Sequence, residues 1–552
     1  MKDSHRWPSK VVVIGLDGAT FDLIRPWAAQ GELPNLKLLM DSGVSRTLQS
    51  VVPPISAGAW SSFMTGKSPG RHGVLGFRPY DLGRYTCFKE KLVNSSYVAG
   101  ETFLDLLSDY GYKVAMICIP ITYPVWEING IMVAGLPTPG SGNYTWPEEL
   151  GARLGTMSIP GDFHTYSPSA KFERSLTVLE ARTALTIETL QDRSFDVTVV
   201  VLSSPDDAHH HFWKFIDPNH PSYDAKEAER YGNIPLELYK RCDEALGRML
   251  AYMDDDTLVI VMSDHGGGPS PTHRFNTNYW LRSQGLLSVK QTPLSGLSAA
   301  LGDILYTIKE HLPYKEHIRR ILPVRTLSTL SSTLMNIASI DWSQTKAYRV
   351  PMYASMEGIE VNLQGRQPEG IVHPGEEYEE LRCLVKQQLL DQFGPKGDGV
   401  IKAVYRKEEI YSGEHLRDAP DLIIGLHKDY TGGISLESPL ITPVPKSFLD
   451  VWSGAHRMNG ILIAQGRNVQ VGVALDDASI MDLAPTILYA LGIPVPSDMD
   501  GKVLLDIFEP AFAKQREIRY ATPVAERQSL ISGLTEEEEK EMVAKLRGMG
   551  YL

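Results

Sequence analysis

The run VVVIGLDG, from Val11 to Gly18, decides the fold. It opens with three valines and an isoleucine and ends in Leu-Asp-Gly. A short, unbroken apolar run of this kind is typical of a strand that is buried on both faces of a parallel sheet. Asp17 then lies at the carboxyl end of the strand, which is the edge where α/β sheets bind their ligands.

Four later runs have the same character as the first. They are KVAMICIP (113–120), FDVTVVVLSS (195–204), TLVIVMSDHG (257–266) and GILIAQG (460–466). Helical patterns separate them, such as ETFLDLLSDYG (101–111) and LELYKRCDEALGRMLAYM (236–253). This alternation predicts an α/β fold with a doubly wound, mostly parallel sheet flanked by helices. The polar residues beside the strand ends are therefore the ones in which to look for a functional site.

Composition narrows the class of protein. The 552 residues carry a formal net charge of -13, which argues against a partner that is a nucleic-acid polymer. The four cysteines lie far apart, so neither a thiolate zinc site nor a disulfide framework is expected. No stretch has the length and apolarity of a secretory signal or a membrane span. We expect a cytoplasmic enzyme, and assembly into a homo-oligomer stays open.

The order of strand-like and helical stretches divides the chain into five parts. Residues 286–347 are helical, proline-interrupted and basic on one side, and we interpret them as a helical cap inserted into the core. A packed surface subdomain, a mobile lid and a membrane-surface helix are the open roles for this cap. The other parts are the first part of the catalytic core (8–285), a continuation or subdomain (348–430), the C-terminal part of the core (431–508), and a tail with a short charged helix (509–552).

Six ionisable side chains gather at the predicted strand ends. Each alone fits an ordinary turn, cap or core residue. Together, three carboxylates at one edge of a sheet would repel one another unless a cation neutralised them. Mixed His/Asp ligation without cysteine favours Zn²⁺, with Mn²⁺ or Fe as competitors, over Mg²⁺ or Ca²⁺. The sequence thus predicts two divalent metal ions bound by Asp17, Asp206, His210, Asp264, His265 and His456.

Ser56 stands between a Pro-Pro break and a helical stretch, in PPISAGAWSSFMTG (53–66). It fits a helix cap, and it equally fits a group that holds or attacks a phosphate at a helix N-terminus. Two nearby cations favour the second role, with Ser56 as a metal-held nucleophile. In the triplet that contains His210, the D-x-x-x-H spacing from Asp206 singles out His210, and we expect His209 and His211 to be bystanders.

These motifs resemble the alkaline phosphatase superfamily, and most closely its type I phosphodiesterase/nucleotide pyrophosphatase branch. The segments GLDGATFD, PPISAGAWSSFMTG, PDDAHHHFW, SDHGGG and SGAHRMNG carry the resemblance, in order, over roughly residues 10–290 and 345–505. It implies an alkaline phosphatase-like fold and a nucleophile at Ser56. It also implies one metal ion on Asp206, His210 and His456, and a second on Asp17, Asp264 and His265, with Ser56 bridging.

The chain departs from the family pattern at one position. Nucleotide pyrophosphatases carry an Asn three residues after the nucleophile, and this chain has Ala59 there. The phosphoryl oxygens would then rest on the backbone N–H of Ala57 and beyond, or on a basic side chain from elsewhere. The candidates for that side chain are Lys67, Arg71, His273 and Arg457.

The resemblance implies a hydrolase that cleaves phosphodiester or pyrophosphate bonds of a small phosphate ester or nucleotide through a phosphoserine. A phosphomonoesterase or phosphomutase of the same superfamily remains an alternative, as does a non-enzymatic binding protein on that scaffold. An arylsulfatase is disfavoured, because SAGAW (56–60) has no proline or arginine where the sulfatase signature needs them.

Overall fold

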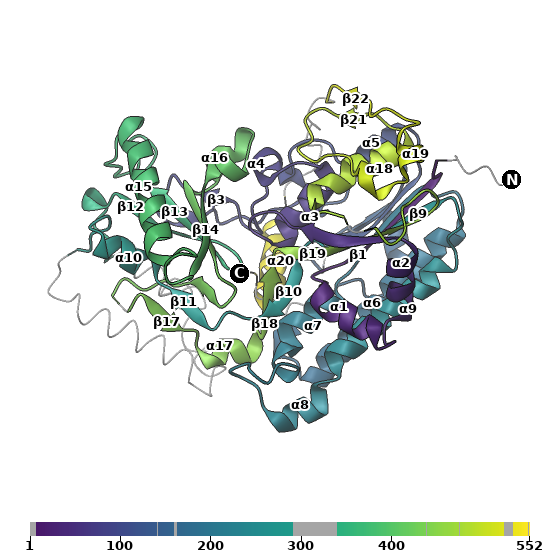
Figure 1. The fold of residues 1–552 in the computed structure, drawn as a ribbon, viewed down its shortest axis with the longest axis horizontal. Helices are drawn as coiled ribbons and strands as arrows, with labels where there is room; N and C mark the ends of the chain where they lie inside the picture. The colour runs from purple at the N-terminus through teal and green to yellow at the C-terminus, as the bar shows by residue number, and fades with distance from the viewer. Residues whose placement is uncertain are drawn as a thin grey trace.

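The computed structural model describes residues 7–140, 142–158, 163–290, 339–437, 439–473, 475–523, 534–549 and 551. One large sheet forms the core of the molecule (Figure 1). Its strands, in spatial order, are β20 (Ala478–Ser479), β2 (Val44–Gln49), β19 (Asn459–Gln465), β9 (Thr257–Met262), β1 (Lys10–Leu16), β8 (Val197–Leu202), β5 (Val114–Ile119), β6 (Gly130–Ala134) and β7 (Thr145–Trp146).

The five predicted runs all lie in this sheet. The five strands β9, β1, β8, β5 and β6 are parallel to one another, which confirms the doubly wound, mostly parallel fold. The run at 460–466 differs from our expectation, because β19 runs antiparallel to both β9 and β2. It follows β18 (Gly454–Arg457), which pairs antiparallel with β10 (Gly266–Pro269), the continuation of β9. The antiparallel ladder thus extends from β10/β18 into the main sheet.

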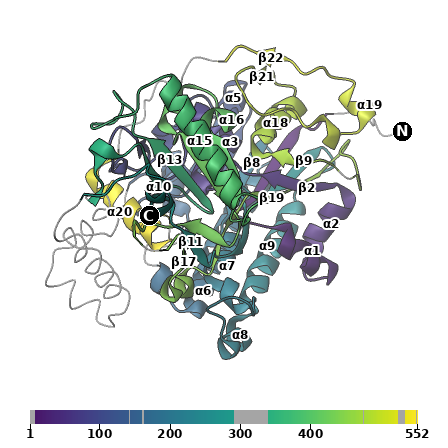
Figure 2. The ribbon, with the colours of Figure 1, turned by 60° about the vertical axis from the view of Figure 1, so that its left-hand side comes forward.

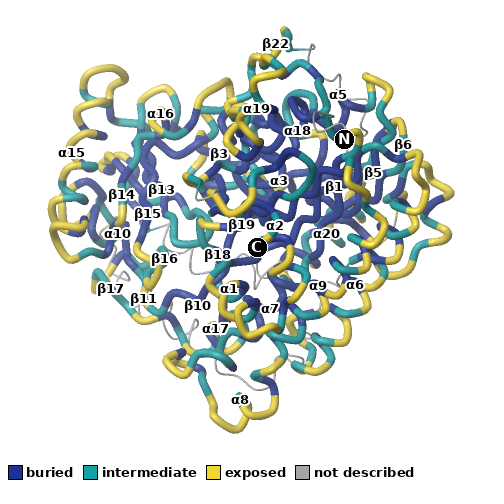
Figure 3. The backbone as a smooth tube through the Cα atoms, turned by 45° about the vertical axis from the view of Figure 1, so that its right-hand side comes forward, coloured by how far each residue is buried: buried dark blue, intermediate teal, exposed yellow. Residues whose placement is uncertain are grey.

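Helices cover both faces of the sheet. Successive side chains of β1 point to opposite faces, so they contact two different groups of helices. Val11 and Val13 pack with one group of helices, and Val12, Ile14 and Leu16 pack with the other. The first group is α3 (Ser56–Thr65), α5 (Phe103–Asp109) and α18 (Leu483–Leu491). The second is α1 (Phe21–Ala29), α2 (Pro34–Ser42), α6 (Pro168–Gln191), α7 (Ser204–Phe212) and α9 (Ile234–Leu250). Figure 3 shows the buried interior around β1, α3 and β19.

A second, antiparallel sheet forms a separate lobe with its own apolar cluster (Figures 1 and 2). It consists of β12 (Ala347–Pro351), β13 (Met356–Val361), β15 (Leu422–Leu426) and β14 (Ile401–Arg406), with α15 (Glu376–Phe393) packed on it. The expected helical cap falls largely on residues 291–338, which lie outside the described residues. Val289 and Ile340, which flank that segment in the sequence, are paired by an isolated antiparallel bridge. The division into five parts stays a prediction.

The remaining elements are short or lie at the margins. They are α4 (Pro69–His72), α8 (Ala225–Tyr231), α10 (Thr277–Ser283), α16 (Lys407–Ile410), α17 (Lys446–Val451), α19 (Pro510–Ala513), α20 (Glu536–Gly548), β3 (Tyr80–Asp81), β4 (Cys87–Phe88), β11 (His273–Phe275), β16 (Tyr430–Gly432), β17 (Ile441–Pro443), β21 (Val495–Pro496) and β22 (Tyr520–Ala521).

Gly15 lets helix α3 approach strand β1 closely. A Cβ atom at this position would collide with the indole ring of Trp60, whose Nε1 donates a hydrogen bond to Asp17 Oδ2 at 3.3 Å. We expect Gly15→Ala to lower the free energy of unfolding by about 1–3 kcal/mol, because overpacking a filled core forces side chains out of place. Urea unfolding measures this change. Gly155→Ala is the matched control, since its Cβ would meet its nearest neighbour at 3.7 Å. Equal stability of the two variants would contradict the close packing of Gly15 on Trp60.

Candidate active site

Three carboxylates meet at the carboxyl edge of the main sheet, as the sequence predicts. Asp17 follows β1, Asp264 follows β9, and Asp206 lies in the first turn of α7, which follows β8. Each has one oxygen held by a donor: Trp60 Nε1 for Asp17, the Gly18 N–H for Asp264, and the Tyr551 hydroxyl for Asp206. The other oxygen of each is buried without a hydrogen-bond partner. Buried polar atoms without partners are costly, so these three oxygens fit the role of ligands to a cation.

Three imidazoles complete the cluster, and a backbone carbonyl orients each one. His210 Nδ1 lies 3.0 Å from Gly454 O, His265 Nδ1 lies 3.0 Å from Gly266 O, and His456 Nδ1 lies 2.9 Å from Pro54 O. Because a carbonyl only accepts, each Nδ1 carries the proton and donates it. The Nε2 atom of each ring then keeps its lone pair, which is the arrangement that proteins use to present histidine to a metal ion.

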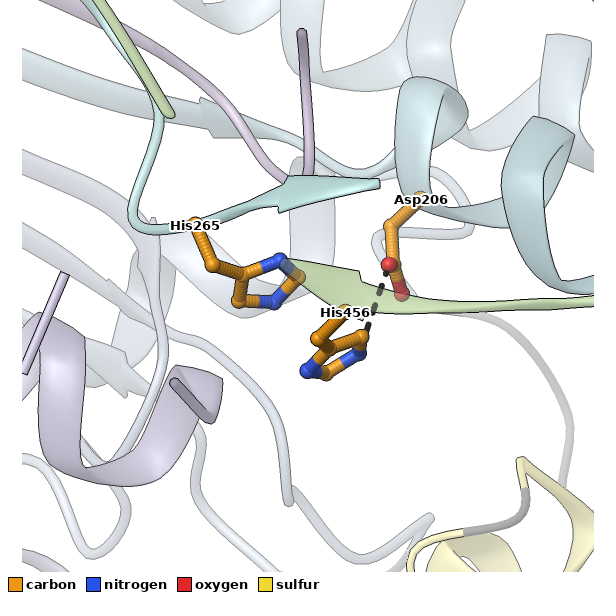
Figure 4. A group of neighbouring side chains, drawn as sticks. All are labelled: Asp206, His265 and His456. Carbon is orange, nitrogen blue, oxygen red and sulfur yellow. Dashed lines mark ion pairs between the residues drawn. The ribbon is translucent and has the colours of Figure 1, made fainter. Parts of the chain in front are cut away.

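The free atoms of these side chains converge. Candidate ligand atoms lie within 4.8 Å of one another in two groups, Asp206 with His265 and His456, and Asp17 with Asp264 and His265. Figure 4 shows the first group, with the three side chains directed toward a common point. His210 joins it, since its Nε2 lies 3.3 Å from Asp206 Oδ1 and 2.9 Å from His456 Nε2. The structure therefore brings all six predicted ligands together, and His265 lies within reach of both groups.

The direction of β19 explains how His456 reaches this edge. His456 lies in β18 and precedes β19, whereas the three aspartates follow β1, β8 and β9. In a parallel strand the preceding residues would lie at the opposite edge of the sheet. Because β19 is antiparallel to β9, its beginning lies beside the end of β9, where Asp264 and His265 stand.

Ser56 lies beside this cluster and does not cap its helix. The N-cap of α3 is Ile55, and no side-chain capping bond is formed. The Ser56 hydroxyl lies 3.2 Å from His265 Nε2 and exposes 1% of its surface. At the first turn of α3 the backbone N–H groups and the helix dipole favour an anion. The hydroxyl thus stands between the candidate metal ligands and a site suited to a phosphoryl group.

The electrostatics of the cluster follow from burial and crowding. Burial, with Asp264 and Asp206 nearby, raises the pKa of Asp17 well above its ordinary value, and burial with Asp206 raises the pKa of Asp264 to about 7. Burial also opposes ionisation of Asp206, but His210 and His456 hold its pKa below the ordinary value. Burial and His265 hold the pKa of His456 well below its ordinary value, so this ring stays neutral. A bound cation would stabilise the ionised carboxylates and needs the neutral rings.

The residues present fit divalent metal ions. Three carboxylate oxygens without partners and three imidazole nitrogens with free lone pairs form an N/O donor set with no cysteine. Such a set is typical of Zn²⁺, Mn²⁺ or Fe sites. The neighbouring histidines lie elsewhere: His209 Nε2 contacts the Tyr239 hydroxyl at 2.8 Å, and His211 Nδ1 lies 3.3 Å from Lys171 Nζ.

The structure places the basic substrate-binding candidates in other contacts. Lys67 ion-pairs with Asp498, and Arg71 ion-pairs with Asp500 at 2.8 Å. The Arg457 guanidinium donates to the backbone carbonyls of Pro269 and His456. Adjacent strand residues point to opposite faces, so His456 and Arg457 do not face the same side of β18.

The last two substrate-binding candidates, His273 and Ala57, lie at different distances from Ser56 in the sequence and in different surroundings. His273 is exposed and contacts the Thr272 hydroxyl at 2.9 Å. Ala57, in contrast, lies in the first turn of α3 next to Ser56. Among the sequence-predicted substrate-binding positions, the backbone N–H of Ala57 is thus the one beside the nucleophile.

Sequence reasoning missed Tyr551 at this site. Its hydroxyl lies 3.1 Å from Asp206 Oδ2 and also interacts with the Ser56 side chain. Tyr551 follows a charged helix and no predicted strand, so no signal in the sequence connected it with the strand ends.

Comparison with known families identifies the chain. The family described as type I phosphodiesterase/nucleotide pyrophosphatase matches residues 11–432. The chain belongs to this family. Membership confirms the resemblance and makes the chain a hydrolase of phosphoester bonds. A comparison with curated protein sequences finds no match.

Several solved structures are similar to this family member at low identity. Phosphonoacetate hydrolase from Sinorhizobium meliloti 1021, in complex with phosphonoformate, aligns with a TM-score of 0.48 at 14% identity, over 88% of this chain and 96% of that one. Murine ectonucleotide pyrophosphatase/phosphodiesterase 5, in complex with AMP, aligns with a TM-score of 0.45 at 13% identity, over 91% and 100%. The human protein gives 0.44 at 13% identity, over 90% and 99%. At this level of similarity they assign no substrate to this chain.

Among the helices of the described residues, none combines the length and the apolar character needed to cross a bilayer.

Proposed function

We propose that this family member is a metal-dependent phosphohydrolase that cleaves phosphodiester or pyrophosphate bonds through a phosphoserine at Ser56. The observation that carries the proposal is the convergence of three unpartnered carboxylate oxygens and three imidazole Nε2 atoms beside the Ser56 hydroxyl. The expected substrate is a small phosphate ester or a nucleotide. A cytoplasmic location and a homo-oligomeric assembly remain predictions from the sequence.

Two divalent cations, with Zn²⁺ as the expected metal, fit the six ligands. Asp206, His210 and His456 would hold one ion, and Asp17, Asp264 and His265 the other, with Ser56 as a shared ligand. When bound, such ions lower the pKa of a coordinated hydroxyl and stabilise the charge on the attacking and leaving oxygens.

The residues of the chain define two steps. Ser56 Oγ attacks phosphorus, so that the Oγ–P bond forms while the bond from phosphorus to the leaving oxygen breaks. A water molecule then attacks phosphorus and releases Ser56 with a phosphate product. The free N–H groups at the start of α3, including that of Ala57, bind the phosphoryl oxygens and orient them for both steps.

A panel of esters tests the proposal. The chain is stripped of metal, reconstituted with Zn²⁺ or Mn²⁺, and assayed with bis-p-nitrophenyl phosphate, p-nitrophenyl phosphate and a p-nitrophenyl nucleotide ester. We expect a higher kcat/KM for the two diesters than for the monoester, no turnover after chelation, and recovery on adding metal back. A steep preference for the monoester would contradict the diester assignment, and turnover that persists in chelator would contradict the metal requirement.

A further inference from the structure

Tyr551 lies inside the candidate active site although it comes from the far end of the sequence. Its hydroxyl donates to Asp206 Oδ2 at 3.1 Å and interacts with Ser56. Its ring packs against Phe77 at a centroid distance of 4.7 Å and edge-on to His456 at 5.9 Å and His210 at 6.1 Å. The side chain is buried, with 8% of its surface exposed. Tyr551 therefore donates to a candidate metal ligand and lies beside the candidate nucleophile.

Helix α20 fixes Tyr551 in this position. Met542 and Leu546 on its inner face are fully buried among residues that include Ile55 and Ala57, the neighbours of Ser56. Polar side chains secure the same helix to loops near the site. The pairs are the Leu92 N–H with Glu539 (3.0 Å), the Gly140 N–H with Glu541 (2.7 Å), Lys545 Nζ with Thr138 O (2.9 Å) and Ser158 Oγ (2.8 Å), and the Tyr123 hydroxyl with Glu538.

The hydroxyl of Tyr551 is compatible with bound cations. It donates to Oδ2 of Asp206, whereas Oδ1 is the atom without a hydrogen-bond partner. His210 Nε2 and His456 Nε2 lie on the Oδ1 side, at 3.3 Å and 3.6 Å. Tyr551 thus bonds to Asp206 Oδ2, and the Oδ1 atom stays available to a cation held by His210 and His456.

A phosphoryl group in the site would come within reach of this hydroxyl. Phosphorus poised for attack lies about 3–3.5 Å from the nucleophile's oxygen, so its non-bridging oxygens surround Ser56 Oγ. Lys67 contacts Asp498, Arg71 contacts Asp500, and Arg457 donates to the carbonyls of Pro269 and His456, so none of these contacts is with Ser56 or a carboxylate of the site. The Tyr551 hydroxyl already donates to one anionic oxygen beside Ser56, and a phosphoryl oxygen is an acceptor of the same kind.

We propose that Tyr551 is a catalytic residue whose hydroxyl, which donates to Asp206 Oδ2 in this structure, exchanges that hydrogen bond for one to a non-bridging phosphoryl oxygen when the ester binds. This rests on the proposed function, because it assumes that a phosphoryl group binds at Ser56. It extends that function by giving the site a side-chain donor in addition to the N–H groups of α3. Because the buried ring is held in place by its neighbours, only the O–H bond has to turn for the hydroxyl to stabilise the charge that develops on the phosphoryl oxygens during attack.

The variant Tyr551→Phe tests this proposal, because it removes the hydroxyl and keeps the buried ring. We expect kcat/KM for bis-p-nitrophenyl phosphate to fall about 100-fold, as on removal of one donor to a developing oxyanion. We expect the dissociation constant of inorganic phosphate, measured calorimetrically on the zinc-loaded chain, to rise about tenfold. Metal content and the melting temperature should stay unchanged. Tyr112→Phe is the matched control, since its hydroxyl donates at 3.1 Å to Leu491 O, far from the site.

Three results would overturn the proposal. Faster turnover or tighter phosphate binding in Tyr551→Phe would mean that the hydroxyl blocks the site. Values equal to those of Tyr112→Phe would mean that it does not contact the phosphoryl group. Loss of metal would mean that it acts by positioning Asp206. Phosphate binding does not depend on turnover, so if the wild-type chain cleaves no ester, the proposed function fails while the binding comparison still decides the role of Tyr551.

Discussion

Ser56→Ala is expected to abolish ester hydrolysis and leave the metal content intact. The substitution removes the oxygen that attacks phosphorus, and loss of a nucleophile costs about 10³-fold or more in kcat. All six nitrogen and oxygen ligands remain, and each stays anchored by its own partner. Turnover of bis-p-nitrophenyl phosphate and elemental analysis of the same preparation measure the two effects separately.

Ser61→Ala is the control for this experiment. Ser61 lies on the same helix and is equally buried, but its hydroxyl donates only to the Ala57 carbonyl within α3, at 2.8 Å. We expect near wild-type activity, because that hydrogen bond is local to the helix. Wild-type turnover in Ser56→Ala would remove Ser56 from the mechanism. Equal inactivation of both variants would show that the helix, and not the Ser56 hydroxyl, had been damaged.

The central sheet could be predicted because its strands are buried on both faces. Runs such as 11–16 and 197–202 must be apolar throughout, and that signal survives in a single sequence. The aspartates that follow these strands could then be assigned to one edge by topology alone. Five of the six candidate ligands were predicted in this way, whereas His456 precedes β19 and its role was implied by the family resemblance. The backbone carbonyls that orient the imidazoles, such as Gly454 O and Pro54 O, could not be foreseen.

Contacts between segments distant in the sequence limited the rest of the prediction. The antiparallel direction of β19 depends on its pairing with β9 and β2, and an apolar run does not encode a direction. The partners of Lys67 and Arg71 are Asp498 and Asp500, more than four hundred residues away, so these side chains looked free in the sequence. Tyr551 reaches Asp206 only because α20 packs beside Ala57.

His456→Ala is expected to lower metal occupancy and activity together. The ring is held by the Pro54 carbonyl and presents Nε2 at 3.6 Å from Asp206 Oδ1 and 2.9 Å from His210 Nε2. Removing one of three protein ligands weakens a site of this kind strongly, and the remaining Asp206 and His210 do not complete a four-coordinate shell. Elemental analysis should therefore find about one metal ion fewer per chain, with turnover reduced by about 10³-fold or more.

His211→Gln provides the matched comparison, because it removes a buried imidazole adjacent in sequence to His210. Its Nδ1 contacts Lys171 at 3.3 Å, and its ring packs on Trp452 and Phe163, so it presents no atom to the carboxylates. We expect this variant to keep full metal occupancy even if packing changes lower its stability. Full occupancy in His456→Ala, or an equal loss of metal in both variants, would contradict the ligand assignment. The comparison of His456 with His211 thus separates a direct role in binding the cation from a general effect of disturbing the buried site.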